Sequence, residues 1–392
     1  MNTRAFRTSQ RMAQVQAPII PVIAGLTRAY PGTLSLGQGV VFYGPPAAAL
    51  DAAHRFGQSA GEHLYGPVQG QPELLDAITR KLARENGIDL GGGRRIMVTA
   101  GSNMAFLNAL LAIADVGDEI ILPLPYYFNQ EMAIRMVGCV PVGVATDAAC
   151  QLDLAALSAA ITPRTRAIVT ISPNNPTGAV YPEADLRAVN ALCRERGVYH
   201  ITDEAYEYFT WDGARHFSPA SIAGADAHTI ALYSLSKAYG FASWRIGYMV
   251  LPEHLTEAVL KVQDTNLICA PRISQVAATA ALAIGRAHSE CYLPSLARVR
   301  AAVLSELRAV DHLCRIPPAG GAFYLLLDVA SPLPAQTLAE RLIREHGVAV
   351  IPGNAFGLTS GCHLRIAYGA LEEATARAGV CRLTAGLRAL CE

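Results

Sequence analysis

The chain has 392 residues, of which 52% are hydrophobic and 16% are charged, and its 32 basic residues balance 32 acidic residues. A chain of this length and composition can bury a large core, which excludes a disordered or fibrous protein. The formal net charge of zero gives no electrostatic footprint for nucleic acid or for an anionic membrane, so the expected partner is a small molecule.

The first residues and the cysteines indicate a cellular compartment. The start, MNTRAFRTSQRMAQ, is polar and lacks the apolar stretch of a signal peptide, and the chain has no run of 18 apolar residues. The nine cysteines are scattered and never spaced as C-x-x-C, which argues against a disulfide framework and against a zinc site. We therefore expect a soluble, cytoplasmic protein with free thiols and no bound metal.

Short β-rich runs alternate with helical stretches from about Arg95 to Val250. The β-rich runs are RRIMVTA, DEIILPL, CVPVGV, TRAIVTI, VYHITD and HTIALYS, and helical stretches such as SNMAFLNALLAIA lie between them. This alternation predicts an α/β fold, in which helices cover both faces of a mostly parallel sheet. Such sheets bind ligands at the carboxyl ends of their strands, where Gly101, Ser102, Tyr127, Asn175, Asp203 and Lys237 fall.

The pattern changes after about Ser289. A long helix (292–310), a β-like run (322–328), another helix (338–346), two short strands and a terminal helix are typical of a smaller α+β unit. We therefore expect three parts: an N-terminal segment (1–35) that packs on the small domain, a large domain (36–288) and a small C-terminal domain (289–392).

Lys237 carries the clearest chemical signal, in the run SLSKAYGFASWR that follows the apolar strand HTIALY. A lysine just past a strand end is usually a solvated surface residue. Here, however, Ser234, Ser236 and Arg245 flank it and would form an anion site beside a primary amine. An amine beside a phosphate site is what Schiff-base chemistry with pyridoxal phosphate requires.

Two other strand ends carry polar groups that suit the same cofactor. Asp203 ends the run VYHITD, and Tyr206 follows three residues later. A carboxylate there is often a helix cap, but near Lys237 it would keep a pyridine nitrogen protonated. Asn175, in the turn SPNNPTG, and Tyr206 would both donate to the phenolic oxygen of the cofactor, although Asn, Pro and Gly are also ordinary turn residues.

Two further strand ends are less specific. Ser102 and Asn103 open a helix directly after Gly101, and the free N–H groups of a helix N-terminus suit a phosphate. Serine is also an ordinary N-cap residue. Tyr126 and Tyr127 begin the next segment, where one ring would either pack in the core or stack on a planar cofactor.

Taken in order along the chain, these motifs resemble those of the class I/II, aspartate-aminotransferase-like enzymes, which are fold type I pyridoxal-phosphate enzymes. The resemblance rests on G-S-x-x-A, P-x-Y, N-P-T-G, D-E-A-Y, S-x-S-K with an arginine eight residues later, and a late L-R-I-A, and it covers essentially the whole chain. It implies a large domain with a mostly parallel seven-stranded sheet covered by helices, and a smaller α+β domain.

The resemblance also implies roles at the cofactor. Lys237 would form the Schiff base and carry the proton, and Asp203 would hold the pyridinium. Tyr206 and Asn175 would bind the phenolic oxygen, and Tyr127 would stack on the ring. The phosphate would be bound by Ser102, Asn103, Ser234 and Arg245, with Ser236 assisting.

Other implied roles concern the substrate and a second subunit. Arg365 would clamp the substrate α-carboxylate, and Gly39, Tyr127 and Asn175 would contact the substrate. Tyr65 resembles the tyrosine that reaches the phosphate of the neighbouring subunit's cofactor. This implies a homodimer with shared active sites.

The leading functional prediction is an aminotransferase that exchanges an amino group between an L-amino acid and a 2-oxo acid through pyridoxamine phosphate. A pyridoxal-phosphate lyase or a cyclising synthase on the same scaffold remains open. A transcription regulator is disfavoured, because the motifs begin by about residue 34 and leave no room for a DNA-binding module before them. Asp264 falls near the position where dicarboxylate-specific relatives place an arginine, and Arg272 lies close enough in sequence to replace it.

Overall fold

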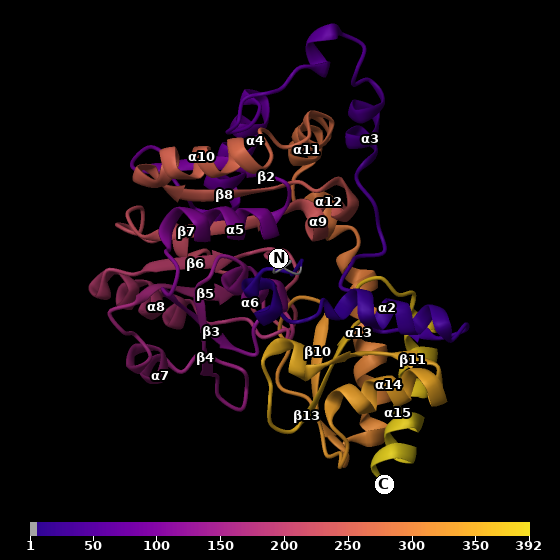
Figure 1. The fold of residues 1–392 in the computed structure, drawn as a ribbon. Coiled ribbons are helices and arrows are strands. Elements are labelled where there is room, and N and C mark those ends of the chain that lie inside the picture. The colour runs from indigo at the N-terminus through magenta and orange to yellow at the C-terminus, as the bar shows by residue number, and fades with distance from the viewer. Residues whose placement is uncertain (1–5) are drawn as a thin grey trace, which may run out of the picture.

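The structure is a computed structural model that describes residues 6–392, and a seven-stranded sheet forms its centre (Figure 1). The strand order is β2 (Arg94–Thr99), β8 (Gly247–Pro252), β7 (Thr229–Ser234), β6 (Tyr199–Asp203), β5 (Thr165–Ile171), β3 (Glu119–Leu124) and β4 (Val140–Ala145). The strand β8 is antiparallel to β2 and β7, and the other neighbours are parallel. The prediction of a mostly parallel sheet is confirmed. The pattern had not singled out β8, which runs antiparallel because a short segment instead of a crossover helix joins it to β7.

Alternating side chains along the strands bury both faces of this sheet. On β2, Met97 packs with α5 (Ser102–Ile113), α6 (Phe128–Met136) and α10 (Thr256–Asn266). Its neighbours Ile96 and Val98 pack with α4 (Pro72–Lys81) and α11 (Arg272–Ile284) on the opposite face. That second face is completed by α7 (Leu154–Ala159) and α8 (Glu183–Arg196). Helices on both faces explain why the strand sequences are apolar throughout.

A second, antiparallel sheet follows in the C-terminal part of the chain. Its order is β12 (Ile351–Pro352), β13 (Cys362–Ala367), β10 (Tyr324–Val329) and β9 (Cys314–Arg315). It shares a core with α13 (Leu293–Leu307), α14 (Ala335–His346) and α15 (Glu373–Cys391). The predicted helices and strands of this region are present, and a 3₁₀ turn (Arg308–Val310) completes the span expected for the first helix.

The N-terminal segment contacts a helix of the central sheet and residues of the C-terminal part. The short helix α1 (Gln10–Gln14) lies on α6, and Ile19 and Ile23 of α2 (Ile19–Ala29) pack on Ile343 and Ile351 of the C-terminal part. The strand β1 (Leu34–Ser35) pairs in parallel with β11 (Val348–Ala349). These contacts bring the first strand of the chain beside its last quarter.

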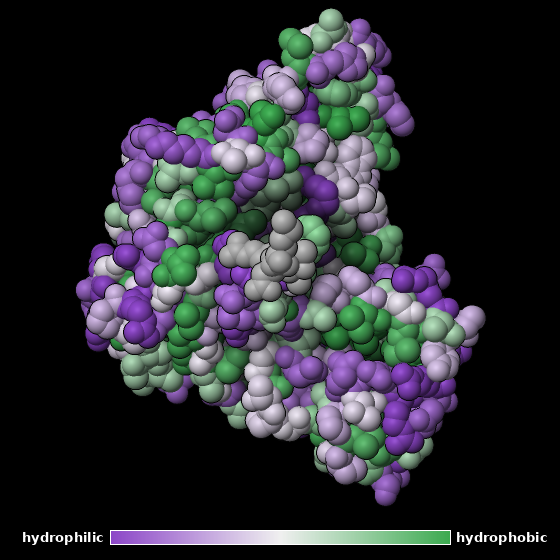
Figure 2. All heavy atoms as spheres, viewed as in Figure 1, coloured by the Kyte–Doolittle hydropathy of each residue, from purple (hydrophilic) through white to green (hydrophobic). Residues whose placement is uncertain are grey.

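The chain between α3 (Ala47–His54) and α4 projects from the molecule (Figure 1). The helix α3 itself packs on α11, and the projection contains the 3₁₀ turn η1 (Ala60–His63). Figure 2 shows apolar and polar residues side by side over the face in view, this projection included. Two short helices complete the fold, α9 (Leu235–Ala238) and α12 (Ala287–Glu290). Within residues 6–392, no helix is both long and apolar enough to cross a membrane.

Gly178 lies where the two sheets meet, and it provides a test of that contact. Its φ is +74°, and an added Cβ would approach the carbonyl oxygens of Tyr324 and Gly321 to 2.7 and 2.9 Å. Gly197, with φ +67°, has open space around it. We expect Gly197→Ala to lower the free energy of unfolding by about 1 kcal/mol through backbone strain alone. Gly178→Ala should cost about 1 to 3 kcal/mol more through the clash. Equal losses in denaturant titrations would show that the close contact is unimportant.

Candidate active site

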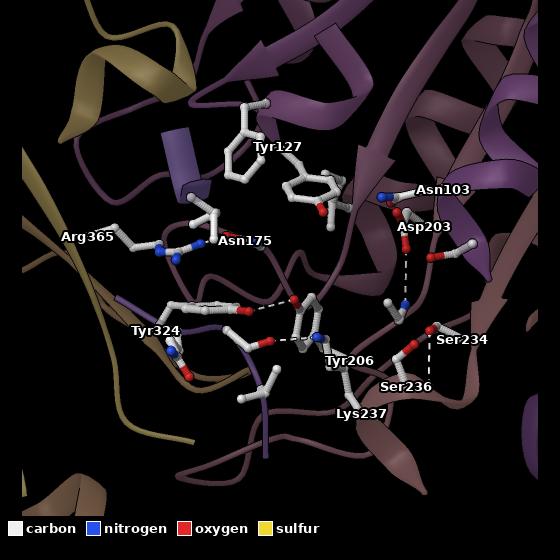
Figure 3. Close-up of a pocket in the computed structure, with 18 of the residues that line it drawn as sticks. Asn103, Tyr127, Asn175, Asp203, Tyr206, Ser234, Ser236, Lys237, Tyr324 and Arg365 are labelled. Carbon is white, nitrogen blue, oxygen red and sulfur yellow. Dashed lines mark hydrogen bonds between the residues drawn. The ribbon is translucent and has the colours of Figure 1, made fainter. Parts of the chain in front are cut away.

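A cavity of about 320 Å³ opens where the carboxyl ends of β2, β5, β6 and β7 face the second sheet. It collects side chains at or just after the ends of β2, β3, β5, β6 and β7, and side chains from β10 and β13 (Figure 3). Its lining includes Gly39, Ser102, Asn103, Tyr127, Asn175, Asp203, Tyr206, Ser234, Ser236, Lys237, Arg245 and Arg365. Tyr65 is the one predicted site residue that lies outside this lining.

Lys237 projects into the cavity from α9, a single turn that follows β7. The side chain of Ser234 caps this turn by accepting from the backbone N–H of Ser236 (3.1 Å). The Lys237 amine donates to the carbonyl oxygen of Gly39 (2.5 Å). Burial, together with the positive charges of Arg365 and Arg245, lowers the pKa of the Lys237 amine to about 8. At pH 7 about a tenth of the amine is therefore uncharged and able to act as a nucleophile, against well under a thousandth for an ordinary lysine.

A candidate anion site, here called the phosphate cup, lies beside Lys237 at the start of α5. It consists of Ser102, Asn103, Ser234 and Arg245. Gly101 precedes the helix with φ +85°, and an added Cβ there would meet the guanidinium of Arg245 at 2.3 Å. The Arg245 guanidinium donates to the carbonyl oxygens of Ala242 (2.9 Å) and Ala100 (3.3 Å). Free N–H groups of a helix start, serine hydroxyls and a guanidinium together suit a phosphate dianion.

Asp203, at the end of β6, is the acidic side chain among the cavity's lining residues. Burial raises the pKa of this carboxyl group to about 6, and the charge of Glu204 adds to the effect. The N–H of Ala205 (3.1 Å) and the amide of Gln130 (3.0 Å) donate to it and oppose the shift. A cation placed against this carboxylate would bring the pKa down again, so the site favours a positively charged ligand atom here.

Tyr206 and Asn175 approach the cavity from neighbouring loops, and each already has a partner. The hydroxyl groups of Tyr206 and Tyr324 lie 2.7 Å apart, and the Asn175 side-chain oxygen accepts from Arg365 (3.0 Å). Burial holds the pKa of Tyr206 well above its usual value, so the phenol keeps its proton. The Asn175 amide nitrogen is the atom that stays available to a ligand.

Arg365, on β13, is a charge with almost no exposure to water, since its exposed fraction is 2%. Its guanidinium donates to Asn175 and to the carbonyl oxygen of Gly37 (2.6 Å), and it lies 4.7 Å from the centre of the Tyr324 ring. Its Nε has no hydrogen-bond partner, and burial lowers the pKa of the group. No carboxylate in residues 6–392 forms an ion pair with it, so this buried cation lacks a counter-ion.

Position 39 requires a glycine because the loop there runs close to the second sheet. A Cβ at this position would meet the Tyr324 hydroxyl group at 2.4 Å. Glycine therefore lets the loop that accepts from Lys237 pass against Tyr324.

Three residues of the site escaped the sequence analysis. Tyr324 belongs to an apolar run that indicates only a buried strand, and its hydroxyl group is revealed by the contact with Tyr206. Gln130 orients Asp203, and Tyr43 donates to the carbonyl oxygen of Lys237 (3.0 Å). Both lie far along the chain from their partners, and no local pattern marks them.

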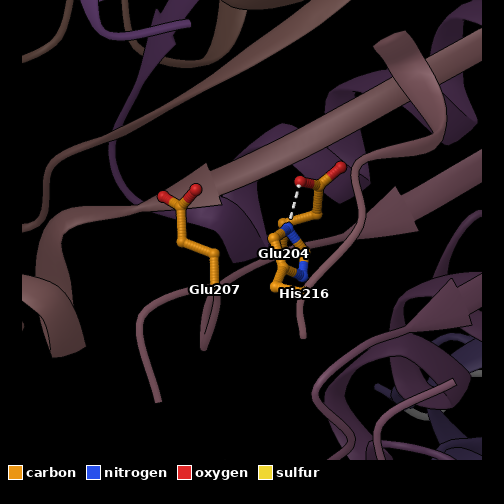
Figure 4. Close-up of side chains that lie close together, drawn as sticks. All are labelled: Glu204, Glu207 and His216. Carbon is orange, nitrogen blue, oxygen red and sulfur yellow. Dashed lines mark hydrogen bonds and ion pairs between the residues drawn. The ribbon is translucent and has the colours of Figure 1, made fainter. Parts of the chain in front are cut away.

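Glu204, Glu207 and His216 form a separate cluster outside the cavity lining (Figure 4). Glu204 accepts from Ser218 (2.8 Å) and lies 2.9 Å from the His216 ring nitrogen. Glu207 is ion-paired with buried Lys81 (2.6 Å). These internal partners account for the carboxylates as a buried polar network.

Comparison with known proteins agrees with this geometry. A family model described as aminotransferase class I and II matches residues 31–383. The chain belongs to the class I and II aminotransferases. It is 34% identical to the aromatic aminotransferase ISS1 of Arabidopsis thaliana, over 97% of this chain and 96% of the relative. It is 36% identical to an aspartate/prephenate aminotransferase of Thermus thermophilus, over 87% of each chain.

The fold of this aminotransferase is that of solved relatives. A single mutant of Thermus thermophilus aspartate aminotransferase superimposes with a TM-score of 0.88 at 33% identity, over 97% of this chain and all of the other. The predicted fold type I architecture is confirmed.

The lowered pKa of Lys237 predicts selective labelling. In the cofactor-free protein, an amine-reactive acylating reagent should label Lys237 with a midpoint near pH 8. Labelling of the exposed Lys261 serves as an internal reference for the amount of reagent. In Arg365→Met the Lys237 midpoint should move upward, because one repelling charge is gone. Peptide mass spectrometry measures both, and an unchanged midpoint in Arg365→Met would contradict the repulsion.

Proposed function

We propose that this protein is a pyridoxal-phosphate-dependent aminotransferase that moves the amino group of an L-amino acid to a 2-oxo acid. The observation that carries the proposal is one half-buried amine near two guanidinium groups, neither of which has a carboxylate partner within residues 6–392. One guanidinium, Arg245, belongs to a cup that suits a phosphate, and the other, Arg365, suits a carboxylate.

The residues of the cavity suit the phosphate, the ring nitrogen and the phenolic oxygen of this cofactor. Ser102, Asn103, Ser234 and Arg245 would hold its phosphate, with Ser236 beside them. Asp203 would accept a hydrogen bond from the protonated ring nitrogen. The positive charge of that nitrogen would stabilise the Asp203 carboxylate, whose pKa burial raises. Tyr127, Tyr206 and Asn175 would contact the ring and its phenolic oxygen, and Lys237 stands within the same cavity.

When bound, pyridoxal phosphate supplies an aldehyde for imine formation and a ring that accepts the electrons of the substrate Cα–H bond. The side chains of this protein would position the substrate and transfer protons. Lys237, with its lowered pKa, would take the proton from Cα and return it elsewhere on the same face. Arg365 would hold the α-carboxylate in place, and the loop at Gly39 would exclude water.

The half-reaction tests transamination against elimination or cyclisation. Holoenzyme mixed with an amino-acid donor and no acceptor should convert its cofactor to the pyridoxamine form in amounts equal to the active sites. Release of ammonia with turnover would favour the lyase alternative. Lys237→Ala and Lys237→Arg should both slow the conversion by more than about 10³-fold, because neither supplies a base of suitable pKa. Wild-type rates in either variant would contradict the role of Lys237.

We infer that the donor side chain is neutral. Ile20, Val40 and Phe128 give the cavity an apolar part of its lining, and Arg365 would be committed to the α-carboxylate. Asp264 and Arg272 lie outside the cavity, and Arg272 donates to backbone carbonyls instead. No further cation in the described chain lines the cavity for a second carboxylate, apart from Lys237 and Arg245.

A donor panel checks this inference. We expect the kcat/KM for phenylalanine to exceed that for aspartate by about tenfold or more, because the buried β-carboxylate of aspartate would lack a charged partner. The reverse order would show that a second copy of the chain supplies a cation to the side-chain pocket.

We also propose a homodimer with shared sites. Tyr65 has an exposed fraction of 79% and Leu64 one of 68%, and both lie outside their own cavity. A second copy that covers this projection would receive Tyr65 at its own phosphate cup. We propose the division into residues 1–35, 36–288 and 289–392 on the basis of the two sheets and the helices that pack on each. A cytoplasmic location stays a prediction.

A further inference from the structure

The projecting segment Gly61–Gln71, here called the arm, carries Tyr65 but has few structural supports of its own. Leu64 and Tyr65 are largely exposed, and the backbone hydrogen bonds within the arm are those of two turns, Leu64 to Gly61 and Gly70 to Pro67. A segment with so little buried apolar surface needs external contacts to keep one conformation.

Those contacts come from the backbone of β2, which forms two hydrogen bonds with Gln69 (2.8 and 2.9 Å), and from side chains of one stretch of chain, residues 263–275. Gln263 donates to the carbonyl oxygen of Val68 (2.6 Å), and Gln275 accepts from the backbone N–H of Gln71 (2.7 Å). These two glutamines hold the C-terminal half of the arm. Gln263 also donates to the Val98 carbonyl oxygen on β2 (2.7 Å), which ties this half to the central sheet.

Arg272 holds the other half, next to Tyr65. One nitrogen of its guanidinium donates to the carbonyl oxygens of both Gly61 and Leu64 (2.5 and 3.0 Å). A Cβ on Gly66 would lie 3.4 Å from the Arg272 side chain, so the arm packs directly on its stem. The Nε of Arg272 is buried and unpartnered, and the described chain gives this guanidinium no carboxylate.

We propose that Arg272 is a positioning residue that fixes the arm so that Tyr65 reaches the active site of a second copy of this chain. The inference rests on the shared-site dimer proposed above. A direct role of Arg272 as a cation for the substrate side chain fits less well, because its Nη1 is already committed to two backbone carbonyls. Arg272 thus acts in one subunit, and the effect appears in the site of the other.

The first experiment compares Arg272→Met with Arg382→Met in the holoenzyme. Arg382 is a matched control, since it also donates to two backbone carbonyls, those of Gly32 (2.7 Å) and Gly347 (2.9 Å), but lies in α15 far from the arm in sequence. Hydrogen exchange of a peptide that covers the arm should accelerate by about tenfold in Arg272→Met and stay unchanged in Arg382→Met. Unchanged exchange in Arg272→Met would overturn the proposal.

Cofactor affinity supplies a second readout. Arg272→Met should raise the dissociation constant of the cofactor as much as Tyr65→Phe does, and the double variant should show no further loss, because both changes remove the same contact. Arg272→Lys should restore part of the affinity. Additive losses, or an altered aspartate KM with unchanged cofactor affinity, would assign Arg272 to a different role and overturn the proposal.

Mixed dimers decide in which subunit Arg272 acts. Consider a dimer in which one subunit carries Lys237→Ala and the other carries Arg272→Met. The only site that keeps Lys237 belongs to the Arg272→Met subunit, and it receives the arm of the other subunit, whose Arg272 is intact. That site should bind cofactor with wild-type affinity. A dimer of the double variant Lys237→Ala, Arg272→Met with the wild-type chain should instead keep one weakened site. The opposite pattern would place the action of Arg272 within its own subunit and refute the proposal.

The wild-type protein separates this inference from the function on which it rests. Failure of wild-type holoenzyme to form or to transaminate would reject the proposed function. Wild-type transamination by a species that sediments as a monomer would reject the positioning role and leave the function standing.

Discussion

The arrangement of the site depends on three positively charged groups that are placed around one cavity. Lys237, Arg245 and Arg365 share one cavity, and Asp203 is the acidic group in its lining. Burial, with repulsion from the two arginines, lowers the pKa of Lys237 to about 8, whereas burial raises the pKa of Asp203 to about 6. The cavity therefore disfavours the charged form of both residues, and a ligand with two anionic ends and a cationic ring atom would relieve both effects.

The fold places these charged groups together because several strand ends and the second sheet meet at the cavity. The antiparallel return from β7 to β8 carries the chain through Lys237 and back past Arg245, which then meets Gly101 at the start of α5. On the second sheet, Leu326 lies opposite Arg365, and Tyr324 lies opposite Ala367. Tyr324 and Arg365 are thus diagonal neighbours on one face, which explains the stacking of the guanidinium on the ring.

Much of this arrangement could be predicted from the sequence, because parallel strands place their carboxyl ends at one edge. Lys237, Asp203 and Asn175 each follow an apolar run directly, and the cavity contains all three. Tyr324 could not be predicted in this way, since an apolar strand gives no sign of where one hydroxyl group points. Arg365 resembles an exposed strand-end arginine by its sequence position alone, and its burial depends on contacts with residues more than 150 positions away.

Arg365 retains enough donors to bind a carboxylate without losing the contacts that hold it. A guanidinium has five N–H donors in a planar fork. Asn175 and Gly37 each use one of them, and Nε is unpaired, so three donors remain. Because the two engaged donors belong to different terminal nitrogens, Nε and each terminal nitrogen keep one N–H for a carboxylate. The fixed contacts to Asn175 and Gly37 therefore orient the arginine before a substrate arrives, which reduces the entropy lost on binding.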